Sequence, residues 1–366
     1  MTVRQQIEDR ERDYLSPYAV LSAASAGRPR PEEDDPVRTA FQRDRDRLIH
    51  LCSAFRRLAH KTQVFIATTQ DHFRTRLSHT LEVSQIARTI AKALRLNEDL
   101  VEAIALGHDV GHTPFGHAGE DALDQIYRHY DPSAHFAHHE HSLRVVDLLE
   151  RDGRGLNLSH ETRAGILAHS KSMADLADDL AAALPVAPAS RRCGVAPAPS
   201  LEAMVVRVAD RLAYVNHDLD DSLRAGLLTF DQIPREILAE VGERHSARVG
   251  RMVEDLIAHS QDSPRLQMSP EVLQATDALK NFLVENVYQA DWMRQEAAKA
   301  KRIVSTLFQL YMESGADFAE GETWSTERPE RARQVCDYVA GMTDRYACDR
   351  YLQRMLPSGA PSFEAE

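Results

Sequence analysis

The sequence predicts an all-α fold. Apolar residues recur at intervals of three and four over most of the chain, which is the spacing of one buried helix face. No stretch alternates apolar and polar residues convincingly enough to compete as a strand. With 366 residues, 43% of them hydrophobic and 27% charged, the chain can bury a substantial core in one large helical domain or in two smaller ones.

The first 38 residues have the composition of a polar arm. Residues 27–36 contain three prolines and four acidic residues, and such a stretch cannot hold a regular helix. We therefore expect an extended N-terminal arm that precedes the helical body.

The helical pattern starts near residue 41. A first amphipathic helix has Leu48, Leu51, Cys52, Phe55, Leu58 and Ala59 on its apolar face, and a second runs from about His79 to Leu94. A third begins after Asn97, whose side chain is a good N-cap, and ends at Gly107 and Gly111. Further helical patterns cover residues 140–151, 161–170, 201–224, 271–285, 294–312 and 331–344.

These patterns divide the chain into an arm at 1–38, a core at 39–230, a C-terminal helical region at 231–356 and a tail at 357–366. An Ala- and Pro-rich stretch at about 184–200 reads as a flexible insertion in the core.

Charge and cysteine content exclude several classes of protein. A net charge of -12 argues against coating of nucleic acid by the whole surface, so a polyanionic substrate would need a local cationic patch. The four cysteines lie far apart without a Cys-x-x-Cys pair, which indicates neither a thiolate zinc site nor a disulfide framework. Without an apolar signal segment or a run of bilayer length, we expect a cytoplasmic protein with no membrane partner.

Residues 107–120, GHDVGHTPFGHAGE, concentrate the chemistry of the chain. His108, His112 and His117 stand here with Asp109 and Glu120 among glycines that allow a tight turn. Imidazole can bind a metal or move a proton near neutral pH, and a neighbouring carboxylate offers a hard oxygen ligand. The segment therefore indicates metal-dependent hydrolysis.

Two distant residues can complete such a site. His79 falls on the apolar stripe of its helix, where a single histidine is more often a core residue than a ligand. Asp210 shares a helix face with Tyr214, His217 and Asp221. A polar face on a single helix is more often exposed to solvent. However, a face that combines tyrosine, histidine and acidic residues without lysine is better suited to the wall of a cavity. Two histidines and two aspartates favour Mn²⁺, Mg²⁺ or Fe²⁺, and zinc is also compatible.

His79, the pair His108-Asp109 and Asp210 follow the H…HD…D pattern, and the chain resembles the HD-domain phosphohydrolases. A narrower resemblance is to the deoxynucleoside triphosphate triphosphohydrolases of the deoxyguanosinetriphosphate triphosphohydrolase-like group. It is carried by residues 74–83, 107–120 and 208–211, with support from 41–50, 54–58 and 337–345. The resemblance implies an HD-domain helical phosphohydrolase fold with additional helices, with residues 39–230 as the HD phosphohydrolase core.

The resemblance also implies roles for individual residues. His79, His108, Asp109 and Asp210 would bind the metal, His117 and Glu120 would form the catalytic pair, and His138 would contact phosphate. The implied nucleotide contacts are Gln63, Arg76, Tyr214, Asp218 and Asp344, with Arg76 placed to grip phosphate oxygens and Tyr214 to pack on the sugar.

The sequence says less about the roles of three further histidines. His112 is a structural residue of its turn or a support for the ligands. His139 and His141 depart from the family's His-Asn-Glu-Gln-Ser segment; we interpret them as surface residues, with altered activity or adventitious metal binding as alternatives.

The function that this reading predicts is hydrolysis of a deoxynucleoside triphosphate to the deoxynucleoside and inorganic triphosphate. One alternative is another HD activity, a 5′-nucleotidase or a cyclic-nucleotide phosphodiesterase, on the same metal. A second is a nucleotide-responsive regulator without turnover. The resemblance further suggests a homo-oligomer, a tetramer or hexamer, and allows a nucleotide or single-stranded DNA effector.

Overall fold

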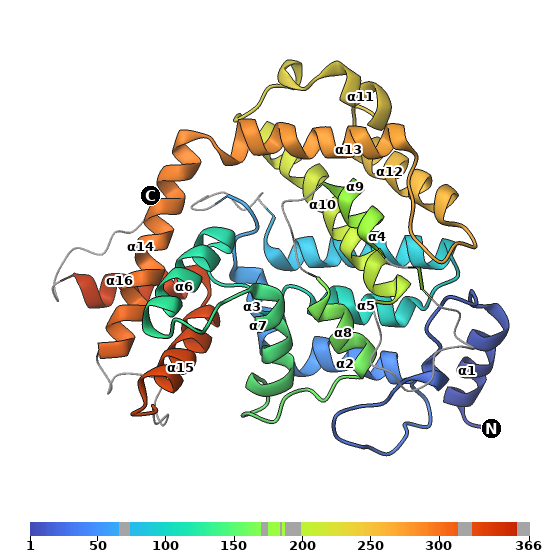
Figure 1. Cartoon of the computed structure of the whole chain (residues 1–366), viewed down its shortest axis with the longest axis horizontal. Helices are drawn as coiled ribbons and strands as arrows, with labels where there is room; N and C mark the ends of the chain where they lie inside the picture. Colours follow the sequence, from blue (N-terminus) through green and yellow to red (C-terminus); the bar gives the residue numbers. More distant parts are fainter. Residues whose placement is uncertain (66–73, 170–174, 184, 187–198, 314–323, 357–366) are drawn as a thin grey trace.

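The computed structural model describes residues 1–65, 74–169, 175–183, 185–186, 199–313 and 324–356, and over these residues the protein is helical (Figure 1). The described residues contain no strand, only an isolated bridge between Thr62 and Thr75. The predicted all-α fold is therefore confirmed. Over the same residues, no helix combines the length and apolar character needed to cross a bilayer.

The α-helices in chain order are α1 Val3–Tyr14, α2 Ala40–Leu51, α3 Ser53–Arg57, α4 Arg76–Ala93, α5 Glu98–Gly107, α6 Gly116–Tyr130, α7 His138–Arg144, α8 His160–Leu167, α9 Leu176–Ala182, α10 Leu201–Arg224, α11 Arg235–Val241, α12 His245–Ser260, α13 Pro270–Leu283, α14 Asp291–Glu313, α15 Arg328–Ala340 and α16 Asp344–Met355. A π-helical turn, Val145–Leu149, extends α7, and another, Val284–Tyr288, follows α13.

Helix α10 is the centre of the main core. It packs on α4, α5, α12 and α13, while α5 lies between α4 and α2. Its apolar stripe, which includes Val205, Val208 and Leu212, is fully buried, as the helical spacing predicts. A second core forms where α6 meets α14 and α15, on the left of Figure 1. The HD motif follows α5 and precedes α6, and so it lies between the two cores.

Several predicted helix boundaries are confirmed. Helix α10 has the predicted bounds, and the Asn97 side chain accepts a hydrogen bond from Leu100 N at 3.1 Å as the cap of α5. The first helix differs, because the chain breaks it at Cys52 into α2 and α3. The Glu150 carboxylate causes the break by accepting from the backbone N–H groups of Ser53 and Ala54, at 2.9 and 2.8 Å, which starts a new helix there.

The N-terminal arm is not wholly extended. Residues 27–36 contain no helix, as expected, but α1 forms at the start of the arm. A reciprocal cap between Thr2 and Gln5 starts α1, and an ion pair between Arg4 and Glu8 supports its polar surface. Such a helix has too weak an apolar stripe to be recognised from hydrophobic spacing.

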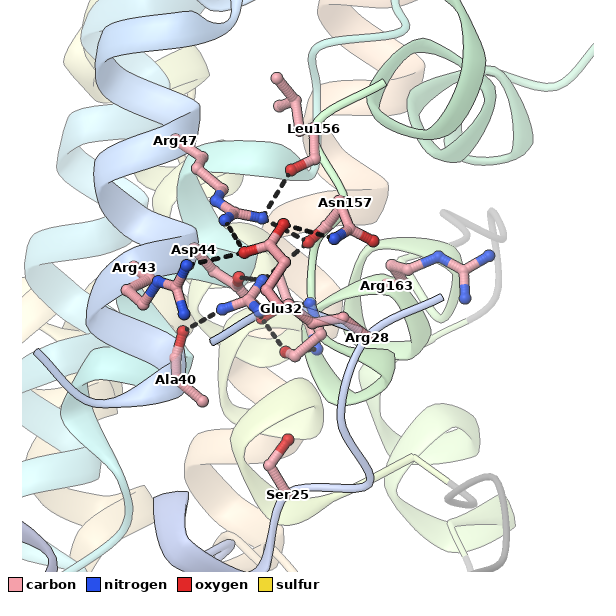
Figure 2. Close-up of polar contacts among 12 residues, drawn as sticks. Ser25, Arg28, Glu32, Ala40, Arg43, Asp44, Arg47, Leu156, Asn157 and Arg163 are labelled. Carbon is pink, nitrogen blue, oxygen red and sulfur yellow. Dashed lines mark hydrogen bonds and ion pairs between the residues drawn. The ribbon is translucent and has the colours of Figure 1, made fainter. Parts of the chain in front are cut away.

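Figure 2 shows how the arm is fastened to the body. Arg28 pairs with the buried Asp44 of α2 and donates to the carbonyl oxygens of Asn157 at 2.7 Å and Ala40 at 2.8 Å. Asp44 also accepts from Ser159 N at 2.9 Å, at the start of α8. The arm, α2 and α8 therefore share one buried carboxylate.

The expected insertion at 184–200 falls mostly outside the described residues, and the tail at 357–366 falls wholly outside them.

Candidate active site

The structure brings the four predicted metal ligands together. His79 comes from α4, Asp210 from α10, and His108 and Asp109 from the turn that ends α5; each is at most 1% exposed. His79 Nε2 lies 2.7 Å from Asp210 Oδ1, and His108 Nε2 lies 3.4 Å from Asp109 Oδ1 and 4.0 Å from Asp210 Oδ1. Two nitrogen and two oxygen donors from three helices thus converge on one buried point.

Close packing against α7 fixes the turn that carries the HD pair. A Cβ on Gly111 would lie 2.1 Å from the backbone nitrogen of Ser142, so only glycine fits at this position. The Ser142 hydroxyl donates to the carbonyl of His108 at 2.8 Å and accepts from Gly111 N at 2.9 Å. The backbone on both sides of Asp109 is therefore held in place.

A hydrogen bond on the far side of its ring makes His108 suitable as a metal ligand. His108 Nδ1 lies 2.6 Å from the carbonyl oxygen of Ala105, which can only accept, so Nδ1 carries the proton. Its Nε2 then has a lone pair directed at the carboxylates, and this atom has no hydrogen-bond partner within the described part of the chain. A buried lone pair of this kind fits a metal ion.

Contacts that run from Glu82 through His217 fix the proton of His79 in a similar way. Glu82 Oε2 lies 3.0 Å from Nε2 of His217, and His217 Nδ1 lies 3.4 Å from Nδ1 of His79. Burial, reinforced by His79, lowers the pKa of His217 to about 2, so this imidazole is neutral. If Glu82 accepts from His217, the proton between the two imidazole rings sits on Nδ1 of His79. Nε2 of His79 and Oδ1 of Asp210 are then two lone-pair atoms 2.7 Å apart, an arrangement that a shared cation stabilises.

The predicted catalytic residues meet on Glu120. Its two carboxylate oxygens lie 3.1 Å from Nδ1 of His117 and 2.8 Å from Nδ1 of His138. Burial raises the pKa of the Glu120 carboxyl, but the hydrogen bonds from His117 and His138 outweigh burial and place the pKa well below its ordinary value. An ionised Glu120 orients both rings, and His117, with half of its side chain exposed, is open to solvent.

His112 lies between this group and the metal ligands. Its ring stacks on His138 with centroids 4.0 Å apart, and its Nε2 lies 3.5 Å from Asp109 Oδ1. Burial and the nearby Arg76 hold the pKa of His112 well below its usual value, so the ring is neutral.

A cavity of about 450 Å³ opens beside these groups. Two of the predicted nucleotide contacts, Gln63 and Tyr214, line it together with His117 and Asp210. Arg211 and Lys280 add basic side chains to the wall. A larger cavity, of about 860 Å³, lies between α3, α7, α15 and α16, but its described lining includes none of the predicted metal ligands or nucleotide contacts. The chemistry therefore assigns the smaller cavity to the candidate site.

The other predicted nucleotide contacts lie outside this lining. Arg76 is 1% exposed and donates from Nη1 to Asp109 Oδ2 at 2.7 Å, so its charge is paired with one of the candidate metal-binding residues. Asp218 accepts a hydrogen bond from Tyr288, which itself lines the cavity. Asp344 accepts from Phe115 N at 2.9 Å and from Thr62, and so it holds the turn before α6. Contact of these three residues with a nucleotide stays a prediction.

Comparison with known proteins agrees with this geometry. An HD domain matches residues 76–215, which include all four candidate ligands, and a phosphohydrolase-associated domain matches residues 266–353. A deoxyguanosinetriphosphate triphosphohydrolase-like protein of Caldanaerobacter subterraneus subsp. tengcongensis is 47% identical over 364 residues, 100% of this chain and 98% of the relative.

The chain belongs to the deoxyguanosinetriphosphate triphosphohydrolase-like family of HD-domain phosphohydrolases. Family members from Desulfatibacillum aliphaticivorans, 47% identical over 98% of this chain and 99% of the relative, and from Clostridium perfringens, 42% identical over 98% of both, share the name. The family predicted from the sequence is thereby confirmed.

One interpretation within the family's histidine-rich segment is wrong. His141 is 2% exposed and not a surface residue; its ring packs on Phe136, and Nδ1 lies 3.7 Å from Asp337 Oδ1. It shares the inward face of α7 with His138 and Ser142, three and four residues apart along one face. His139 points away from that face and is half-buried.

Sequence reasoning missed His169. This residue follows α8, is 2% exposed, and places Nε2 3.2 Å from Asp210 Oδ2. Its ring centroid lies 4.4 Å from that of His108. The one available signal was its position three residues after the apolar Ile166, on the inward face of a predicted helix.

Proposed function

We propose that the protein hydrolyses deoxynucleoside triphosphates, of the dGTP type, to the deoxynucleoside and inorganic triphosphate in a reaction that depends on a divalent metal ion. The observation that carries this proposal is the 450 Å³ cavity, because Asp210 shares its wall with His117, Gln63 and Tyr214. A nucleotide in this cavity can have its α-phosphate beside the metal ligands and its sugar beside a tyrosine ring.

The donor set of His79, His108, Asp109 and Asp210 fits Mn²⁺, Mg²⁺ or Fe²⁺, and zinc is also compatible. A divalent ion held by these residues would polarise a phosphate oxygen and lower the pKa of bound water. The hydrolysis adds one water across the bond between the α-phosphorus and O5′, so the leaving O5′ must receive a proton.

His117 is the group that we assign to this proton. Its Nδ1 faces the ionised Glu120, so Nδ1 keeps a proton and Nε2 is available to take one or give one. His138, held by the same carboxylate, is the side chain that we expect to contact phosphate, and His112 stacks on it from the buried side. Arg211 and Lys280 line the same cavity and pair there with Asp179 and Asp175, so a polyanionic tail would compete with these carboxylates for the two cations.

The identity of the products tests the proposed reaction. We expect each accepted deoxynucleoside triphosphate, incubated with Mn²⁺ or Mg²⁺, to give inorganic triphosphate in the phosphorus NMR spectrum, and exhaustive chelation to abolish turnover. Pyrophosphate with the monophosphate, or orthophosphate with the diphosphate, would rule out the triphosphohydrolase assignment. Turnover after chelation would rule out the metal.

Discrimination between sugars tests the role of Tyr214. The ring lines the cavity one helical turn after Asp210, so it can close the space beside C2′ of a bound sugar. Tyr214→Ala should shift the GTP to dGTP ratio of kcat/KM toward GTP by about tenfold or more, even though both rates fall. Tyr214→Phe keeps the ring and should keep the ratio. Competition between the two nucleotides measures it, and an unchanged ratio in a folded, metal-loaded Tyr214→Ala protein would remove Tyr214 from sugar selection.

The proposal also includes the oligomeric state of the protein and its regulation by an effector. A homo-oligomer, tetramer or hexamer, and an effector nucleotide or single-stranded DNA are expected from the family resemblance alone. Light scattering of the purified protein, with and without each nucleotide, tests both expectations.

A further inference from the structure

We infer that the short helix α9 carries two built-in competitors of the substrate's phosphates. Asp175 and Asp179 bind basic side chains that line the nucleotide cavity, and this pairing weakens the binding of a polyanion there. The inference rests on the proposed function, because it takes this cavity to be the place where the triphosphate binds. It names two residues that set the affinity for that part of the substrate.

Three cations and two carboxylates form the contact. Asp179 gives one oxygen to each of two arginines on α10: Oδ1 accepts from Arg207 Nη2 at 2.6 Å, and Oδ2 accepts from Arg211 Nη2 at 3.0 Å. Asp175 Oδ1 accepts from Lys280 Nζ, on α13, at 2.5 Å. Arg211 and Lys280 are the arginine and the lysine of the cavity's described lining. Both of these side chains are thus already bound to a carboxylate of the α9 segment.

The two acidic residues share one face of the helix. Asp175 stands at the N-cap position of α9, and Asp179 lies about one turn later, four residues along the chain. Leu176 and Leu180, which are also four residues apart, are 1% and 8% exposed and belong to the main hydrophobic core. Helix α9 therefore buries its apolar side while it presents its carboxylates to α10 and α13.

Helix α13 holds α9 in register with these cations. The Asp277 carboxylate accepts from Leu176 N at 2.6 Å and from Ala177 N at 3.1 Å, so it caps the first turn of α9. Asp277 lies three residues before Lys280 on the same face of α13. One stretch of α13 thus fixes the start of α9 and supplies the cation for Asp175, and α9 cannot turn its carboxylates away without losing this cap.

The charges determine how these pairs act on a polyanion. Among the five side chains, two negative charges offset two of the three positive ones. The side chains of Arg211 and Asp179 are each 11% exposed and that of Lys280 is 6% exposed, so water screens the pairs poorly. A phosphate that approaches either cavity cation must compete with a carboxylate and is repelled by it. Neutral replacements of the carboxylates should therefore raise the positive potential of the cavity wall and tighten polyanion binding.

Binding of inorganic triphosphate tests the inference without any turnover. Isothermal titration calorimetry of the full-length protein, with excess Mg²⁺ and at fixed ionic strength, should show that Asp175→Asn and Asp179→Asn each tighten binding about 3- to 10-fold, and the double variant about tenfold or more. Asp178→Asn is the matched control, because Asp178 is exposed on another face of α9. In a Lys280→Gln background, Asp175→Asn should have no effect, since the cation for which it competes is absent.

An unchanged or weaker affinity in the double variant would overturn the inference, because the carboxylates would then orient the cations for phosphate rather than compete with it. A gain from Asp175→Asn that persists in the Lys280→Gln background would overturn it as well. If the double variant fails to fold, Asp175→Asn decides alone, since the Asp175 side chain is 43% exposed. A parent protein that binds inorganic triphosphate but releases none from deoxynucleoside triphosphates would refute the proposed function and leave this inference standing.

Discussion

Asp210→Ala should lose metal and activity together. Asp210 supplies one of the two carboxylates at the centre, and the histidine ligands His79 and His108 bring no negative charge that could replace it. We expect stoichiometric Mn²⁺ in the parent protein, little in the variant, and a fall in kcat/KM of about 10³-fold or more, because a catalytic metal contributes several kcal/mol to the barrier.

Elemental analysis after gel filtration measures the metal, and the circular dichroism spectrum reports the fold. Asp220→Ala is the control, because Asp220 lies on the same helix, partly exposed, with Arg224 at 3.2 Å. An Asp210→Ala protein that retains metal and turnover would remove Asp210 from the centre.

His117→Ala should separate metal binding from turnover. The His117 side chain is half exposed, and its Nδ1 faces the carboxylate of Glu120. The variant should therefore keep its metal and its affinity for substrate while kcat falls about 10²- to 10⁴-fold, the usual range for a positioned proton-transfer group.

Metal content and kcat measured on the same preparation check this prediction. His129→Ala provides a matched control, since His129 is an exposed histidine in the last turn of the same helix, α6. If the His117→Ala protein proves to be metal-free, His117 is a ligand and the catalytic assignment is wrong.

Helical periodicity and local motifs predicted much of the candidate centre. The pair His108-Asp109 is adjacent in the chain, and the spacing of Asp210, Tyr214 and His217 placed them on one face of a helix whose other face is apolar. Those features depend on neighbours within one or two turns, which a single sequence displays. Packing of α4, α5 and α10 then brought the separate pieces together.

The groups behind the ligands could not be predicted in this way. His169 depends on the approach of α8 to α5, and the contacts from Glu82 through His217 depend on the packing of α4 on α10. Hydrophobic spacing says which face of a helix is buried but not which helix covers it. For the same reason the break at Cys52 was missed, because Glu150, which caps α3, lies 97 residues after Ser53.

The contacts of the N-terminal arm affect the order in which the parts of the domain fold. Arg28 and Ala26 leave the ribosome long before their partners, since Asn157 follows Arg28 by 129 residues and Glu161 follows Ala26 by 135. Until α8 has been synthesised, Asp44 lacks Ser159 and Thr162, and the arm lacks its partners Asn157 and Glu161. Contacts of such long range close slowly, so the arm completes the domain late although it is translated first.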